Sequence, residues 1–456
     1  MLYNINRLTY SLLAKRNGLT DLFSHLDRLE KSQYFTLSQI RDEQFERLRH
    51  ILQHAYLNTE FYRKRFNLYD FNPDKLQSFD DLKKIPPLSK NDIREYGSNI
   101  LAKNIPENRW ERSSSGGTTG IMTWFYRNRE VLAPKEAAIL RFEKWTGWKI
   151  GEWRSIIWPA VMDIKFKRSW KSKLKNFLST RTLTLPLTVI EENSVKTHLD
   201  EIIRKKVSMI RTFPIPITEV ARFCQEKDIS GFQLKGVVTT GEQLHRQQRN
   251  LIEKVFGCPV FDSYRTREIG PIAQECEQHD GLHINAEEVY LEIDHNETGG
   301  KPEGDYGKIL VTDLLNEAMP FIRYEIGDIG MLSDKSCSCG RGLPVLKSVG
   351  GRMVDMLFTA DGRKIVTITV LPNLVEHLGI TNQIQFEQYS VNRLTIRMSE
   401  PRPPAEIIEK QRNIAVKIFG EKMRISYDFV DRIPLLTSGK YRLVISHVKD
   451  QEKDEK

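Results

Sequence analysis

This sequence of 456 residues has little that would suit a secreted or membrane-spanning protein. Its five cysteines are unevenly spaced and too few for a disulfide framework in a chain of this length. No stretch reaches the roughly 18 uncharged apolar residues that a membrane-spanning helix needs. The first residues also lack the basic segment, apolar run and cleavage site of a secretory signal. We therefore expect a cytoplasmic, globular protein.

Signatures of other functional classes are missing as well. The sequence has no internal repeat, no motif of a nucleic-acid-binding fold, and no Walker loop, because the Gly-Lys-Ser/Thr ending is absent. The formal net charge is +9, which three explanations fit. They are a solvated basic surface, attraction to phosphate-rich ligands such as nucleotides, and peripheral contact with a membrane through basic and aromatic clusters such as residues 165–171. We expect no nucleic-acid partner.

The length and the hydrophobic pattern predict an α/β protein with two domains. Short apolar runs at 155–158, 207–210, 234–239 and 259–261 alternate with helix-length segments. This alternation indicates a mainly parallel sheet covered by helices, and we assign residues 1–350 to this large N-terminal domain. In such sheets ligands bind where the carboxyl ends of the strands meet.

The pattern changes after about residue 281. Short strands at 289–293, 307–312 and 330–332, joined by glycine-rich turns, predict a β-rich subdomain that extends to about residue 350. We expect a hinge at Gly350-Gly351. Residues 351–456 then have the size of a small α+β lid. Its expected elements are helices at 370–378 and 405–418 and strands at 393–398 and 424–430.

The segment Ser113–Gly120 is unusually rich in small hydroxyl and glycine residues. This composition favours neither a stable helix nor a packed strand, so we expect a flexible loop. Glycine lets the backbone approach an anion closely, and the N–H groups and hydroxyls donate hydrogen bonds to it. On its own the segment is equally consistent with a phosphate-binding loop and with a solvent-exposed linker.

Four further segments follow this loop in a fixed order, and each alone has an ordinary structural explanation. They are Asp262–Glu268, Arg323–Asp328, Gly351-Arg352 and Pro434–Arg442. The complete order resembles that of the adenylate-forming superfamily of acyl- and aryl-CoA synthetases. Within it, the chain is most similar to the phenylacetate–CoA ligase family, and especially to the CapK-type branch linked to capsular polysaccharide genes. The resemblance covers about residues 35–446.

The resemblance implies a site for ATP and Mg²⁺. Glu268 would help to hold Mg²⁺, and Lys440 would meet the acid carboxylate and the α-phosphate, so these two are the implied catalytic residues. Arg267, which CapK-type proteins often share, stands beside that glutamate. The other implied nucleotide-binding residues are Ser114, Ser115, Gly116, Gly117, Thr118, Thr119 and Gly120 at the phosphates, Gly241, Glu242 and Tyr264 at the adenine, and Asp328 and Arg352 at the ribose.

This set of residues suits the activation of a carboxylic acid. Attack of a carboxylate on the α-phosphate brings two anions together, and a lysine with Mg²⁺ neutralises the developing charge. A lysine on a separate lid predicts that closure completes the site and excludes water. We expect an acyl-AMP that passes its acyl group to a thiol such as CoA. The alternatives are transfer to an amine or hydroxyl of a polysaccharide precursor, and a non-catalytic nucleotide-binding assembly protein.

The sequence departs from the family pattern in several places. The phosphate loop has an extra glycine and no following lysine. Arg265 stands where many relatives have glycine, and Arg267 where many have threonine. Val354 takes the place of a hinge aspartate, and the last motif reads Leu-Leu-Thr-Ser-Gly-Lys. The first half-reaction is therefore better supported by the sequence than the second, which uses the hinge.

A second group of residues is rich in metal ligands. Cys276 is followed by His279 and His283, and Cys337 and Cys339 come about 60 residues later. Thiolates with an imidazole form a four-ligand structural zinc site, and unpaired thiols are the alternative. Because the phenylacetate ligase branch often has Glu-Cys…Gly-Leu-His and Cys-x-Cys-Gly-Arg segments, we assign Cys276, His283, Cys337 and Cys339. His279 is the alternative histidine.

The acid that would be activated is hidden in the sequence. Trp158, Phe213, Pro214 and Pro216 lie just after predicted strands. They either line the acid pocket or pack in the core.

Overall fold

The computed structural model describes most of the chain. The described residues are 2–116, 122–158, 170–186, 192–295, 306–352, 357–361, 364–365, 384–400, 402–431, 433 and 443–448. Four of the predicted phosphate-loop residues, Gly117, Thr118, Thr119 and Gly120, lie outside these ranges. The predicted lysine Lys440 and the predicted helix at 370–378 also lie outside them.

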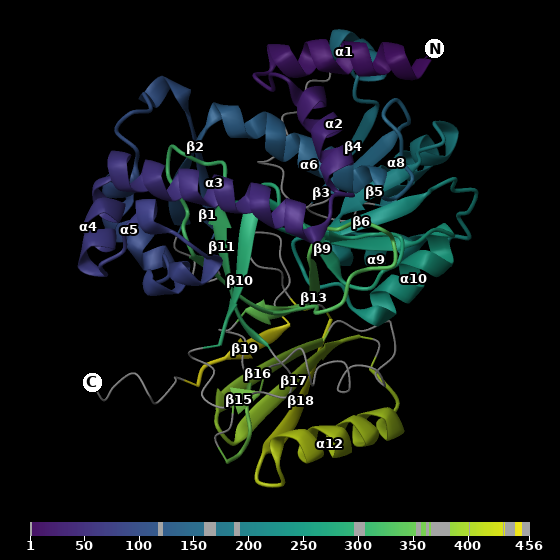
Figure 1. The fold of residues 1–456 in the computed structure, drawn as a ribbon. Coiled ribbons are helices and arrows are strands. Elements are labelled where there is room, and N and C mark those ends of the chain that lie inside the picture. Colours follow the sequence, from purple (N-terminus) through teal and green to yellow (C-terminus); the bar gives the residue numbers. More distant parts are fainter. Residues whose placement is uncertain are drawn as a thin grey trace.

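A single large sheet organises the N-terminal part of the protein (Figure 1). Among the described residues it has eleven strands in the order β10-β11-β12-β13-β9-β8-β7-β6-β5-β3-β4. Strands β4, β3, β5, β6 and β7 pair in parallel, and the strands from β7 to β10 pair antiparallel. The strands are β1 (Trp110–Gly116), β2 (Met122–Asn128), β3 (Arg154–Trp158), β4 (Thr182–Pro186), β5 (Met209–Thr212), β6 (Gly236–Thr240), β7 (Val260–Thr266), β8 (Gly270–Glu275), β9 (Leu282–Ile284), β10 (Val289–Asp294), β11 (Gly307–Asp313), β12 (Tyr324–Leu332), β13 (Val345–Arg352), β14 (Leu357–Phe358), β15 (Lys364–Ile365), β16 (Ile384–Ser390), β17 (Arg393–Ser399), β18 (Arg424–Val430) and β19 (Val444–Ser446).

Helices cover both faces of the parallel strands. The α-helices are α1 (Leu2–Arg16), α2 (Leu22–Ser32), α3 (Leu37–Asn58), α4 (Glu60–Leu68), α5 (Lys90–Ile100), α6 (Leu132–Lys144), α7 (Trp170–Leu178), α8 (Glu192–Arg204), α9 (Pro214–Glu226), α10 (Arg246–Phe256) and α12 (Ala405–Phe419). Short 3₁₀ turns occur at Pro73–Lys75, Phe79–Lys84, Glu107–Arg109 and Arg129–Val131. No described helix is long and apolar enough to cross a membrane. The predicted α/β class is confirmed.

The alternation of side chains along β6 shows how the two layers form. Val237 packs in one core with α8, α9 and α10, and its neighbour Val238 packs in another with α1, α2 and α6. Successive residues of a strand point to opposite faces, so an unbroken apolar run is what a strand buried on both sides requires. The predicted order of strands and helices over residues 155–261 is confirmed, with boundaries shifted by a few residues.

The β-rich region differs from the prediction in one respect. Its strands do not form a separate sheet but continue the parallel sheet, and the switch to antiparallel pairing comes at β7–β8. The strand predicted at 330–332 is the end of the longer β12. β13 runs through the predicted hinge at Gly350-Gly351 to Arg352, where it still pairs with β12. The low strand propensity of glycine is overridden by this pairing.

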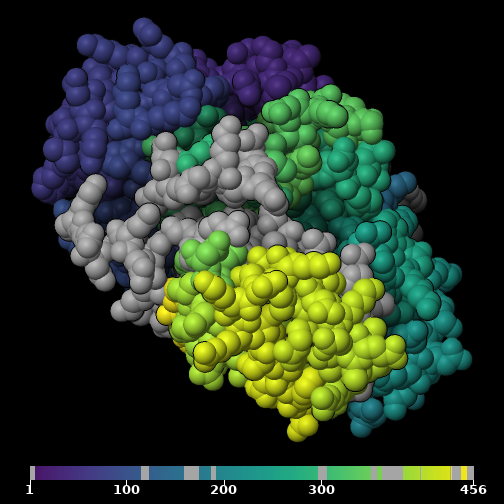
Figure 2. Space-filling model, turned by 90° about the horizontal axis from the view of Figure 1, so that it is seen from below, coloured from purple at the N-terminus to yellow at the C-terminus, as the bar shows by residue number. Residues whose placement is uncertain are grey.

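The C-terminal part has its own four-stranded sheet, in the order β18-β17-β16-β19. β17 and β18 pair in parallel and are connected through α12, whose inner face packs on this sheet through Ala415 and Phe419. The predicted strands at 393–398 and 424–430 and the predicted helix at 405–418 are confirmed. Figure 2 shows this part, in yellow, in front of the N-terminal part when the molecule is seen from below.

Candidate functional site

The base of the predicted phosphate loop is a β-hairpin. β1 pairs antiparallel with β2 from Trp110–Asn128 to Gly116–Met122, and Ser114 lies opposite Trp124. The prediction of a loop from Ser113 onward is therefore wrong for its first four residues, which belong to β1. Pairing with the aromatic strand β2 supplies the backbone hydrogen bonds and cross-strand contacts that Ser and Gly lack by propensity.

Strands β7 and β12 bring two of the predicted nucleotide residues into contact. The Tyr264 hydroxyl, on β7, donates a hydrogen bond to Asp328 Oδ2, on β12, at 2.7 Å. Asp328 is also the cross-strand partner of Arg352 on β13. Three residues from distant parts of the sequence, predicted to hold adenine and ribose, thus lie on neighbouring parts of one sheet.

The predicted metal-binding Glu268 lies in the tight turn between β7 and β8. It is only 6% exposed, and its Oε1 accepts a hydrogen bond of 3.1 Å from the hydroxyl of the fully buried Tyr324. Within the described residues, no donor reaches its second carboxylate oxygen. The neighbouring Arg267 donates to the Ser114 carbonyl at 3.5 Å, which links this turn to the phosphate hairpin.

A buried polar network that the sequence analysis missed holds the Glu268 turn in place. The Lys135 ammonium, on α6, donates to the carbonyl of Ile269 and forms a 2.6 Å ion pair with Asp313. Asp313 accepts from the backbone of Asn316, and the Asn316 amide donates to the Tyr126 carbonyl on β2 at 3.0 Å. The network therefore connects the turn that carries Glu268 with the hairpin that carries the phosphate loop.

The predicted adenine segment directly follows β6. Gly241 has a φ of +84°, and a Cβ built on it would lie 2.3 Å from the Phe213 ring. Only glycine suits this position, because the conformation is left-handed and the space is filled. Glu242, the next residue, is half-buried.

The residues proposed for the acid pocket divide into two groups. The Phe213 ring contacts the Trp158 ring edge-on, with 4.7 Å between centroids, at the carboxyl ends of β5 and β3. Pro214 and Pro216 are buried in the first turn of α9 and pack in the core. Phe213 and Trp158 are thus placed beside Gly241, whereas the prolines begin a helix, as proline's fixed φ favours.

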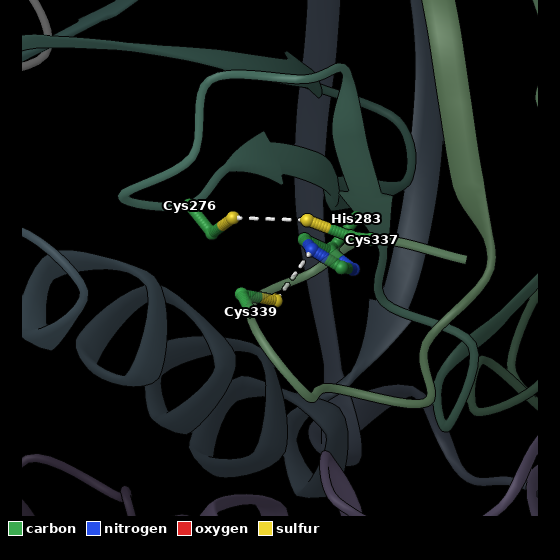
Figure 3. Close-up of side chains that lie close together, drawn as sticks. All are labelled: Cys276, His283, Cys337 and Cys339. Carbon is green, nitrogen blue, oxygen red and sulfur yellow. Dashed lines mark hydrogen bonds between the residues drawn. The ribbon is translucent and has the colours of Figure 1, made fainter. Parts of the chain in front are cut away.

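Cys276, His283, Cys337 and Cys339 come together at the end of β8, on β9 and in the segment between β12 and β13 (Figure 3). Their ligand atoms all lie within 4.8 Å of one another. Cys276 Sγ is 3.7 Å from Cys337 Sγ, and Cys339 Sγ is 3.2 Å from His283 Nε2. Three sulfurs and one nitrogen at this spacing match the donor set of a tetrahedral structural zinc site.

Neighbouring groups orient these ligands for a metal. His283 Nδ1 hydrogen-bonds the Leu343 carbonyl at 3.3 Å, which leaves Nε2 directed at the sulfurs. The backbone N–H groups of Gln278 and Arg341 donate to Cys276 Sγ and Cys339 Sγ. Burial lowers the pKa of His283 to about 4, which keeps its imidazole in the neutral, metal-binding form.

The alternative ligand His279 is not part of this cluster. Its Nδ1 faces the Glu275 carboxylate at 3.1 Å, and its ring packs against Phe261. The choice of His283 over His279 is therefore supported by the geometry. The two other cysteines, Cys224 and Cys258, are buried, and burial raises the pKa of both thiols to about 12.

Comparison with known proteins agrees with this arrangement. Residues 357–447 match the family model of the CapK C-terminal domain. Protein CapK of Staphylococcus aureus is 23% identical over 428 residues, which are 91% of this chain and 90% of that protein. Phenylacetate-coenzyme A ligase of Escherichia coli is 28% identical over 359 residues, 72% of this chain and 75% of that one.

These matches support placing the chain with the phenylacetate–CoA ligase family of adenylate-forming enzymes, in its CapK-type branch. Its fold is also that of a solved relative. The structure of 2-hydroxyisobutyryl-CoA ligase in the postadenylation state in complex with 2-HIB-AMP is 20% identical and superposes with a TM-score of 0.69, covering 90% of this chain and 89% of that one.

The buried polar residues that lie behind the predicted nucleotide-binding residues were not predicted from the sequence. Lys135 and Asp313 are separated by 178 residues. Lys135 lies in an amphipathic helix, where a lysine ordinarily faces water. No local signal distinguishes it from a surface lysine, and only the fold brings it to Asp313.

Proposed function

We propose that this protein activates a carboxylic acid with ATP, releases pyrophosphate, and passes the acyl group of the resulting acyl-AMP to a thiol such as CoA. It is an AMP-forming ligase of the family named above. The observation that carries the proposal is the meeting of Tyr264, Asp328 and Glu268 around the end of β7, beside the hairpin that leads into the phosphate loop.

Each residue has a role that its contacts support. Tyr264 would stack on adenine, and its bond to Asp328 Oδ2 leaves Oδ1 for the ribose hydroxyls. Tyr324 orients the Glu268 carboxylate, whose second oxygen would hold Mg²⁺. Carboxylate oxygens are the ligands that Mg²⁺ prefers, and Mg²⁺ is usually bound by one or two of them together with substrate phosphates.

The remaining contacts to the nucleotide come from the other assigned residues. Ser114 to Gly120 would hold the phosphates, and Gly241-Glu242 would lie beside the adenine. Arg267 would lie between the phosphate hairpin and the metal, and Arg352 near the ribose. Lys440 would neutralise the charge between the acid carboxylate and the α-phosphate.

We assign a structural role to zinc at Cys276, His283, Cys337 and Cys339. Four protein ligands leave no open coordination position for water or substrate, so the metal would stabilise the fold and take no part in the reaction.

Two candidates for the acyl acceptor imply different biological roles. CoA is the first candidate acceptor. The match of residues 357–447 to the CapK C-terminal domain favours a second candidate, an amine or hydroxyl of a surface-polysaccharide precursor.

The activity is tested by acid-dependent exchange of labelled pyrophosphate into ATP over a panel of carboxylic acids. We expect exchange with at least one acid, and product formation when CoA is added to that reaction. Exchange without CoA consumption, together with transfer to an added amine or sugar, would favour the second acceptor. Absence of exchange with every acid, from protein that is folded and loaded with Mg²⁺, would contradict the proposed adenylation.

A further inference from the structure

Three neighbouring strands place basic and hydroxyl side chains on one face at their carboxyl ends. Across the parallel pairs, Arg211 of β5 lies opposite Val238 of β6, and Thr240 lies opposite Ser263 of β7. Directly paired residues share a face, as do residues two apart on one strand. Arg265 Nε donates to Ser263 Oγ at 2.7 Å, which puts Arg265 on this face as well.

Helix α6 covers this face. The arginines between α6 and the sheet outnumber the carboxylates that contact them directly. Glu143 of α6 is fully buried and accepts from both Arg154 and Arg211, the latter at 2.6 Å. Arg265 has no carboxylate partner among the described residues, and its partners there are the neutral side chains of Ser263 and Gln274. Two guanidinium groups therefore share one carboxylate, and the third has no carboxylate in direct contact among the described residues.

Further polar groups on the same face lack a partner. Within the described chain, Thr240 Oγ1 and Arg211 Nε are buried and form no hydrogen bond. Thr240 is only 4% exposed. A buried donor without a partner destabilises the folded state, so such groups in a native protein call for an explanation, and one is a ligand that binds there.

The surroundings of Arg265, which has no carboxylate partner among the described residues, also disfavour its charged form. Burial, with the neighbouring Arg211 as the next cause, lowers the pKa of Arg265 to about 9, against the partial compensation of Glu143 and Glu136. Arg211 retains 17% of its side-chain exposure, so the group is not sealed from solvent. An entering anion would relieve the repulsion between the two guanidinium groups.

The face adjoins the proposed nucleotide site. Arg265 directly follows Tyr264, and Thr240 directly precedes Gly241. Arg211 comes two residues before Phe213, the ring that fills the space over Gly241. All of these residues lie at the carboxyl ends of neighbouring parallel strands, so an acid bound with its carboxylate at the α-phosphate would extend along this edge of the sheet.

We propose that Arg211, Thr240 and Arg265 bind a second anionic group at the far end of the acid, so that the preferred substrate is a dianion such as a dicarboxylic acid. This inference rests on the proposed adenylation. Arginine suits the task because its planar fork of N–H groups matches a carboxylate bidentately and remains charged when half-buried. A neutral or cationic far end would leave the excess positive charge uncompensated.

The test uses matched, unreactive adenylate analogues, so that it measures binding without turnover. The probes are acyl-sulfamoyl adenosines in pairs of equal length: succinyl and butanoyl, glutaryl and pentanoyl, adipoyl and hexanoyl. Their dissociation constants are measured by calorimetry with the full chain. We expect at least one diacid analogue to bind about 10- to 100-fold more tightly than its partner, the range for a hydrogen bond to a charged group.

Two variants and one control locate the effect. Arg265→Met removes the guanidinium without stranding a carboxylate and should abolish the preference for the diacid. Arg265→Gln, which can still hydrogen-bond Ser263 and Gln274, should lose the preference as well, and it replaces the first variant if that one does not fold. Arg204→Met, on the exposed side of α8, should keep the wild-type ratio.

The outcomes separate this inference from the function on which it rests. Equal or weaker binding of every diacid analogue, with ATP bound normally, would overturn the inference alone. An unchanged ratio in both Arg265 variants would also overturn it. If neither ATP nor any analogue binds, the proposed adenylation fails, and the inference fails with it.

Discussion

The cysteine–histidine cluster and the proposed nucleotide face, which is defined by Tyr264, Asp328 and Glu268, belong to the same large sheet, yet their side chains are arranged differently. In the cluster, four ligands converge within 4.8 Å, and backbone N–H groups hold two of the sulfurs. On the proposed nucleotide face, the Tyr264 hydroxyl donates to Asp328 Oδ2, and Glu268 Oε1 accepts from the Tyr324 hydroxyl. The four ligands of the cluster contact one another directly, whereas the proposed nucleotide face would be completed by a ligand and by Lys440.

This difference is the one expected between a site that stabilises the fold and one that performs chemistry. A closed metal site contributes its binding energy to folding, and disturbing it should destabilise the protein whether or not substrate is present. An open site is held by the residues behind it, here the buried network from Lys135 to Asn316. Substitutions at the two sites test this comparison, because they should differ in whether they lower the stability of the fold or the rate of turnover.

Removal of the metal should have the largest effect. Structural zinc contributes about 10–16 kcal/mol of binding free energy in small zinc-binding peptides. Even about half of that would lower Tm by on the order of 10 °C in a domain of this size. We expect Cys337→Ser or treatment with a chelator to produce this fall in thermal unfolding experiments, and metal analysis of the wild type to find about one zinc per chain.

The matched control for the cluster is Cys258→Ala, which removes a buried thiol from a different core. It should keep the zinc and shift Tm only slightly. Wild-type protein that is well folded without metal would contradict the structural zinc site.

The second prediction concerns the open site. Lys440→Ala should reduce acid-dependent ATP–pyrophosphate exchange by about 100-fold or more, the cost of removing one preorganised charge contact, while Tm stays unchanged. Lys417→Ala, an exposed lysine on α12, provides the control. Wild-type exchange rates in the Lys440 variant would remove this residue from its assigned role.

The third prediction concerns the network behind the nucleotide face, which should affect both stability and turnover. Lys135→Met leaves Asp313 buried without its partner, which costs about 3–5 kcal/mol. It also frees the carbonyl of Ile269, so the exchange rate should fall at temperatures where the variant is folded. Denaturant unfolding and the exchange assay measure the two effects.

A second ion pair on the same helix provides the control. Lys144→Met breaks the half-exposed pair with Glu30, which should cost below about 1 kcal/mol and leave exchange intact. An equal loss in the two variants would show that the Lys135 pair has no special role.

The last prediction concerns a pH dependence of stability. Burial, and then the charge of Glu275, raises the pKa of Asp262 to about 7, while Arg249 and the Thr239 hydroxyl oppose the shift. The folded state therefore favours the protonated acid. This contribution is full below the ordinary value near 3.8 and is lost as pH rises toward 7, by up to about 1.4 kcal/mol per pH unit.

Asp262→Asn should remove this slope. We expect the Tm difference between the variant and the wild type to move in favour of the variant between pH 5 and pH 8. Parallel Tm curves over that range would show that Asp262 titrates normally.

The same contrast explains what could be predicted from the sequence. The cluster could be predicted because cysteine and histidine are rare metal ligands and because the family resemblance includes both segments, although only the fold could show that His279 pairs with Glu275. The residues of the proposed nucleotide face were predicted from the order of their motifs, and the fold brings Tyr264 and Asp328 into contact. The strand at Ser113–Gly116 was not, since its stability comes from pairing with β2 and not from its own residues.

The buried polar residues could not be predicted for a related reason. The pairs Lys135–Asp313 and Arg211–Glu143 join residues that are far apart in the sequence. A charged residue in a predicted helix is ordinarily solvated, and nothing local marks these few as buried. Their positions follow from the way α6 lies on the sheet.

The contact between Gly241 and Phe213 limits how this protein can be re-engineered. Any side chain at Gly241 would overlap the Phe213 ring and take up a left-handed backbone conformation. A mutant library aimed at new acids should therefore keep this pair constant and place its diversity at Arg265, Thr240 and Trp158. Most variants with a substitution at Gly241 would fold poorly and could not be selected for activity.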